Sequence, residues 1–139
     1  MPMTNFDYLR EIEPLHDLYT FCQGAEATME SDYDICALHC RRGLEWLVKA
    51  IYTLKHADIG ACSSLYELMS GAPFVEFLDD DRLMSAAHYI RKVGNAAAHP
   101  GEKVKGSQAF FCLLNLYNLV GGTLLKVRVA ETLAPFNKD

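Results

Sequence analysis

Apolar residues recur every three or four positions along most of the chain, and this spacing predicts helices rather than strands. The ranges with this pattern are 5–10, 13–30, 31–55, 65–71, 73–78, 80–99 and 108–131. No stretch shows the sustained alternation of apolar and polar residues that is typical of a half-buried strand. The sequence therefore predicts an all-α fold, a helical bundle of four main helices with shorter accessory helices.

Capping residues indicate where the first helices begin. Thr4 can cap a short helix whose Phe6 and Leu9 face inward, and Pro14 suits the first turn of the next helix, where a missing N–H costs nothing. Residues 31–32, Ser-Asp, are the expected cap of a longer helix that reaches residue 55.

Similar signals divide the second half of the chain. Ser63 or Ser64 can start a short helix that ends at Gly71 in the C′ position. The carboxylates of residues 79–81 could hold a metal ion, but they open a predicted helix, where a cap and a favourable dipole explain them more simply. That helix stops at residues 100–101, Pro-Gly.

The helix over residues 31–55 has one apolar side. Its predicted buried face consists of Ala37, Cys40, Leu44, Leu47, Val48, Ile51 and Leu54. Its charged flanks carry Arg41, Arg42, Glu45 and Lys49. This distribution predicts that the helix packs against other helices along one stripe.

Length and charge limit the classes of protein to consider. The 139 residues fit a single helical domain over 1–139, either complete or a fragment of a longer subunit. The net charge of −5 argues against a generally basic nucleic-acid binder, although it leaves room for a local basic patch. No apolar run approaches the roughly 18 residues of a membrane span, and the start lacks a signal peptide's apolar core, so we expect a cytoplasmic protein with no membrane partner.

The cysteines follow no metal-binding or disulfide pattern. They are odd in number and irregularly spaced: Cys22, Cys36, Cys40, Cys62 and Cys112. We expect reduced thiols that act as small hydrophobic side chains. A metal site built from Cys36, His39 and Cys40 is the alternative, but no further ligand is suitably spaced, so no metal is predicted.

A polar stripe organises the helix over residues 80–99. Its members lie three or four residues apart and share one helix face: His88, Arg91, Asn95 and His99. The residues between them, such as Gly94, are small or apolar and would allow a second helix to approach closely. We expect these side chains to meet Arg42 and Glu45 in a polar seam between two helices.

This seam has two possible roles. An arginine between helices needs a carboxylate, so Glu45 should lie within salt-bridge reach of Arg91 or of an arginine on its own helix, in a network that fixes helix register. Alternatively, the seam is a shallow cleft in which His99 acts as general acid or base and Arg91 stabilises an oxyanion, with Asn95 between them. Common nucleotide-binding, nucleophile-elbow and zinc-protease motifs are absent from the sequence, and no cofactor is predicted for this segment.

Two segments resemble a known family. R-G-L-E-W-L-V-K-A-I-Y at 42–52 and H-Y-I-R-K-V-G-N-A-A-A-H at 88–99 are similar to the all-helical domain at the N-terminus of type I restriction enzyme R subunits, as are N-F-D-Y-L at 5–9 and A-E at 25–26. The resemblance covers nearly the whole chain. It implies an accessory domain of an enzyme that restricts DNA in phage defence, whose ATP-driven motor and nuclease domain lie outside these residues.

More distantly, the chain is similar to HEPN helical domains, many of which are dimeric, metal-independent ribonucleases. Asn95 and His99 match their N-x-x-x-H, but Gly94 stands where an arginine would precede the asparagine. The resemblance therefore implies a HEPN-like fold, with ribonuclease activity as an alternative to a non-catalytic module or a plain protein adaptor. Expected partners are other restriction subunits, DNA or RNA through Arg41 and Arg42, and a second copy of the chain.

Overall fold

The computed structural model describes residues 5–60 and 64–127, and in this part of the chain it contains helices and no strand. The α-helices are α1 (His16–Thr28), α2 (Tyr33–Leu54), α3 (Leu65–Ser70), α4 (Ala72–Leu78), α5 (Asp81–Ala98) and α6 (Gly106–Lys126). Two 3-10 helices precede them, η1 (Asp7–Leu9) and η2 (Glu13–Leu15). The predicted all-α fold with four main helices and shorter accessory ones is confirmed.

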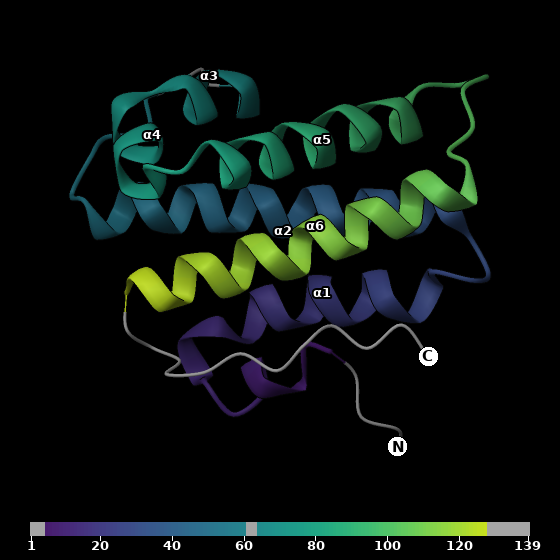
Figure 1. Cartoon of the computed structure of the whole chain (residues 1–139), viewed down its shortest axis with the longest axis horizontal. Coiled ribbons are helices and arrows are strands. Elements are labelled where there is room, and N and C mark those ends of the chain that lie inside the picture. Colours follow the sequence, from purple (N-terminus) through teal and green to yellow (C-terminus); the bar gives the residue numbers. More distant parts are fainter. Residues whose placement is uncertain (1–4, 61–63, 128–139) are drawn as a thin grey trace.

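The four long helices lie side by side, with α2 behind α5 and α6 and with α3 and α4 at one edge (Figure 1). Helix α2 contacts α1, α5 and α6, and α5 also packs on α6. Six of the seven positions predicted for the buried face of α2 are buried, but Leu54 is 54% exposed. Leu54 is the last residue of the helix and lines a hydrophobic pocket with Phe77 of α4 and Leu124 of α6.

The N-terminal segment is held by one aromatic and one polar contact. Phe6 and Leu9 are fully buried, as predicted, and the Phe6 ring meets the Tyr117 ring edge-on with centroids 5.8 Å apart. The backbone N–H and side-chain amide of Asn5 both donate to the Glu26 carboxylate, at 3.1 and 3.0 Å. The predicted cap Thr4 lies outside the described residues. The segment is therefore part of the bundle's core packing.

Side-chain caps start the two helices that form the seam. The Asp32 carboxylate accepts from the backbone N–H of Ile35 at 3.1 Å, at the start of α2. The Asp80 carboxylate accepts from the N–H groups of Arg82 and Leu83 at 2.8 and 3.1 Å, at the start of α5. Both caps were predicted, and each satisfies backbone donors that a helix start leaves free.

Gly71 joins α3 and α4, but not as a left-handed C′ residue. Its φ of −75° and ψ of 152° are extended, so the prediction of a C′ glycine is wrong. The residue must lack a side chain because a Cβ there would collide with the hydroxyl of Tyr52. That buried hydroxyl donates to the carbonyl of Leu68 at 2.7 Å and ties α3 to α2.

Helix α6 begins two residues earlier than predicted. The Gln108 side-chain oxygen accepts from the backbone N–H of Lys105 at 2.9 Å, which extends the helix start to Gly106. Its predicted end at residue 131 lies outside the described residues. Among the described helices, α6 is the one long and apolar enough to cross a membrane by length and composition, with a mean hydropathy of 1.3 in its most apolar window. Of that window, 56% is buried inside the bundle, and core helices of soluble proteins meet the same criterion.

Helices α2 and α5 approach each other most tightly at Gly94. A Cβ added to Gly94 would lie 2.6 Å from the Cβ of Arg41 and 2.8 Å from its Cδ. No substituent fits at these distances unless the helices move apart, because the nearest atom is fixed to the α2 backbone. The small residue within the polar stripe is therefore required by helix packing.

We expect Gly94→Ala to reduce the free energy of unfolding by about 1–2 kcal/mol, because overpacking outweighs the gain of about 1 kcal/mol in helix propensity. Gly43→Ala is the matched control in α2. Its added Cβ would meet Leu116 at an ordinary 3.6 Å, so this variant should be neutral or slightly stabilised. Urea unfolding of both variants measures the difference, and equal effects would contradict the close approach.

Candidate functional site

The polar stripe of α5 lies along the side of that helix that faces α2 and α3. His88, Arg91 and Asn95 are half-buried, and His99 is exposed at the C-cap of α5. Helix α5 rises about 1.5 Å per residue, so the stripe runs over roughly three turns. Its two histidines stand at opposite ends, and Arg91 lies one turn from His88.

Arg91 stacks on an aromatic ring that the stripe alone did not reveal. The central guanidinium carbon of Arg91 lies 4.9 Å from the centroid of the Tyr66 ring, which α3 supplies. The His88 ring lies 6.2 Å from the same ring, tilted by 55°. Tyr66 itself remains 55% exposed. A cation over an aromatic face is attracted by the ring's quadrupole, so these three side chains support one another.

Arg41 and Arg91 are the charged members of the seam, and neither has the expected carboxylate partner. The Nε atoms of both arginines are buried and have no hydrogen-bond partner in the part of the chain that the structure describes. Glu45 instead pairs with Lys49, one turn along α2, at 3.8 Å. The prediction of a Glu45–arginine salt bridge is therefore wrong, since this glutamate is held in the favourable Glu-to-Lys i,i+4 orientation on its own helix.

Arg42 lies outside the seam, contrary to the prediction. It is exposed on α2, one residue beyond the half-buried Arg41, whose side chain packs on Gly94. Successive helical residues are about 100° apart, so only one of the two arginines can face α5. The seam as the structure forms it therefore contains Arg41 in place of Arg42.

The pKa values of one histidine on α5 and one on α2 are lowered by burial and by nearby positive charges. Burial lowers the pKa of His88, and the charges of Arg91 and Lys92 lower it further. Burial also lowers the pKa of His39, with a smaller contribution from Arg42. Across residues 5–60 and 64–127, the salt bridges join Arg10 to Glu11 and Lys49 to Glu45, and no arginine of α2 or α5 takes part in one.

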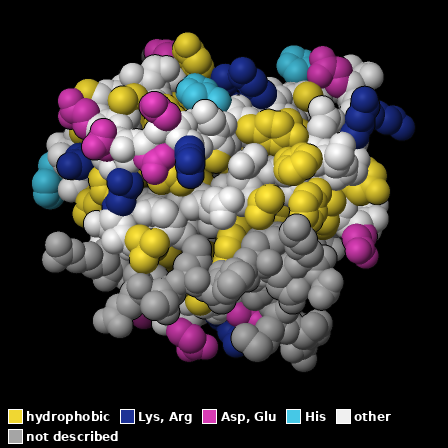
Figure 2. Space-filling view, viewed as in Figure 1, with side chains coloured by type: hydrophobic (Ala, Val, Ile, Leu, Met, Phe, Trp, Pro, Cys, Tyr) yellow, Lys and Arg dark blue, Asp and Glu magenta, His cyan; other side chains and the backbone are white. Residues whose placement is uncertain are grey.

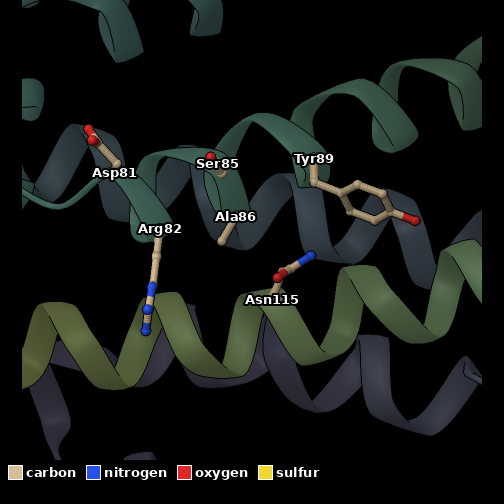
Figure 3. A pocket seen from close by; sticks show the side chains of 6 residues that line it. All are labelled: Asp81, Arg82, Ser85, Ala86, Tyr89 and Asn115. Carbon is tan, nitrogen blue, oxygen red and sulfur yellow. The ribbon is translucent and has the colours of Figure 1, made fainter.

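A groove lies between α5 and α6, apart from the seam, and has a volume of about 490 Å³. Figure 3 shows Arg82 extending from α5 across α6, with the amide of Asn115 directed from α6 toward α5. Asp81 and Tyr89 also line it. Because this groove contains one acid and one base, its charges give it no preference for an anion, in contrast to the seam.

The thiols and carboxylates do not form a metal centre in the described residues, where no three Asp, Glu, His or Cys side chains converge. The Cys36 thiol lies 3.9 Å from the sulfur of Met29, whereas the His39 ring turns toward Gly24 of α1. Free, buried thiols occur at Cys22, Cys36, Cys40 and Cys112. Burial raises the pKa of Cys112 to about 12, so this thiol is protonated at neutral pH. Cys62 lies outside the described residues.

We expect the two perturbed histidines to make the protein less stable as the pH falls. Both His39 and His88 have folded-state pKa values below the usual 6.5, so the unfolded chain binds more protons from just above pH 6.5 downward. Stability should therefore fall between about pH 7.5 and about pH 5.5. Urea unfolding at both pH values should show a smaller loss for the double variant His39→Gln/His88→Gln than for the parent.

His99→Gln is the matched control, because His99 is exposed at the end of α5. An undiminished loss of stability in the double variant would contradict the assignment to His39 and His88.

No family model matches the chain, and no curated protein or solved structure was found to be similar to it.

Proposed function

We propose that this chain is a non-catalytic accessory domain that contacts nucleic acid through the seam between α2 and α5. The observation that carries the proposal is the pair Arg41 and Arg91, whose buried Nε–H groups have no acceptor and whose charges have no carboxylate partner among residues 5–60 and 64–127. An unmet buried donor costs about 1–3 kcal/mol, more when it is charged, so an acceptor from outside the protein would be favoured here.

A phosphate is the acceptor that this chemistry fits best. Guanidinium groups donate in a planar fork that matches the oxygens of phosphate, and charge-assisted hydrogen bonds are the stronger kind. The exposed Arg42 and Lys92 lie beside the seam on α2 and α5 and would extend the positive surface along a nucleic-acid backbone.

Binding is better supported than catalysis by the spacing along α5. Arg91 and His99 are eight residues apart, about 12 Å along the helix axis, and the guanidinium group of Arg91 stacks on Tyr66 of α3. Gly94 cannot carry the cation of an active ribonuclease, because Arg41 occupies the space beside it. Cleavage of RNA by His99 with Arg91 and Asn95 remains the alternative function.

The resemblance to type I restriction R subunits supports a place for this domain in a cytoplasmic, DNA-restricting defence enzyme, with the motor and nuclease on other parts of the subunit. Assembly contacts would use a different surface from the seam. Figure 2 shows hydrophobic side chains gathered toward the end of the molecule where α6 begins. Phe111 at 50% and Tyr33 at 42% are exposed there, and they fit contact with another subunit or a second copy of the chain.

We expect Arg41→Gln and Arg91→Gln to weaken binding of labelled DNA and RNA oligonucleotides in fluorescence anisotropy. Between about 50 and 200 mM salt, each variant should lower the slope of log K against log salt by about 1, because one phosphate contact is lost. Arg10→Gln, on the exposed Arg10–Glu11 pair, is the matched control and should bind like the parent. Unchanged affinity and slope in both seam variants would contradict the proposal.

We expect no cleavage of single-stranded RNA in EDTA by either the parent protein or His99→Ala, since Arg91 stacks on Tyr66 and lies eight residues from His99. Gel analysis of labelled RNA after prolonged incubation measures this. Cleavage by the parent that His99→Ala abolishes would instead establish the ribonuclease alternative.

A further inference from the structure

We infer that Tyr66 forms a stacking platform for an unpaired base, so that the seam selects single-stranded over double-stranded nucleic acid. This inference rests on the proposed function, because it names the form of nucleic acid that the same site would take. It concerns a residue of α3 that lies outside the polar stripe and that no motif singles out.

The Tyr66 ring is contacted by α5 and is still accessible. The guanidinium carbon of Arg91 lies 4.9 Å from the ring centroid, and the His88 ring lies 6.2 Å away with a tilt of 55°. Even so, Tyr66 is 55% exposed, the largest value among the exposed large hydrophobic residues of the described chain. A ring that carries a cation and is more than half exposed could accept a stacked base on its accessible part.

The platform is positioned by short, well-fixed local structure. The Ser64 hydroxyl accepts from the N–H of Glu67 at 3.1 Å, and the Glu67 carboxylate accepts from the N–H of Ser64 at 3.4 Å. These two reciprocal hydrogen bonds form a capping box at the start of α3. The Tyr52 hydroxyl binds the carbonyl of Leu68 at the other end of the helix. Tyr66 therefore keeps its place relative to α5 without relying on a ligand.

Arg91 connects the platform to the seam. Its guanidinium touches Tyr66, and its unpaired Nε–H is part of the same group that would receive a phosphate. A nucleotide with its base on the accessible part of Tyr66 would thus place its own or the adjacent phosphate near Arg91, with Arg41 farther along the seam. In a duplex the bases are already stacked and paired, so a duplex could use the arginines but not the ring.

Stacking accepts any base, because every base has a π-face, and the site therefore predicts weak sequence preference. Loss of one stacked base lowers affinity by roughly 5- to 100-fold in proteins that bind single strands through aromatic side chains. DNA and RNA share this chemistry, and the arms of the experiment below separate them.

The test measures the affinity of the full chain for labelled single strands of about 15 nucleotides, as DNA and as RNA, and for the matching duplex. We expect Tyr66→Ala to lose roughly 5- to 100-fold in affinity for the single strands and little for the duplex. Tyr66→Phe, which keeps the ring, should bind like the parent. Leu125→Ala, at an exposed apolar residue of α6, is the matched control and should also bind like the parent.

Oligonucleotides with several abasic positions give a second measurement that needs no change in the protein. They keep every phosphate, so the parent should bind them as weakly as Tyr66→Ala binds the intact strand. Equal affinity for intact and abasic strands would overturn the inference, as would equal losses for single strand and duplex in Tyr66→Ala.

The two proposals fail in different ways. If Arg41→Gln and Arg91→Gln weaken binding while Tyr66→Ala and the abasic strands do not, the platform is wrong and the phosphate-binding seam stands. If the parent binds neither single strands nor duplex at low salt, the proposed function itself fails.

Discussion

The close approach of α2 and α5 at Gly94 determines the chemistry of this molecule. Without a side chain at that point, the Arg41 stem can pack directly on the α5 backbone. The contact places a guanidinium group of α2 beside the polar face of α5, where Arg91 already lies. Two cations are thus brought to one seam by apolar packing of their stems, and ion pairing contributes nothing to their placement.

Among the described residues, the arginines of the seam also lack a carboxylate that would neutralise them. Glu45, the acid nearest to Arg41 and Arg42 along α2, is engaged by Lys49, and the stacking of Arg91 on Tyr66 supports its charge without neutralising it. A buried salt bridge between Arg91 and Glu45 would have fixed helix register but would have left no capacity for a ligand. The observed arrangement keeps the register through Gly94 and leaves the guanidinium groups available.

Much of the fold could be predicted from the sequence because its signals are local. Helical periodicity and the caps at Asp32 and Asp80 depend on residues within one or two turns, and the structure has both caps. The site could be predicted only in part. The stripe on α5 follows from the spacing of its residues. Whether Arg41 or Arg42 faces it depends on how α2 is rotated against α5. No local signal identifies Tyr66, because its contact with Arg91 joins α3 to α5.

The net charge of −5 does not conflict with an anion-binding seam. Charges separated by more than about 8 Å in water at physiological salt are largely screened, whereas partly buried charges are screened much less. A phosphate at the seam would therefore experience mainly Arg41 and Arg91, and remote carboxylates such as Asp32 and Asp80 are already committed to helix caps. Those remote acids would still oppose nonspecific approach of a duplex to the rest of the surface, so under the proposed function nucleic acid would be confined to the seam.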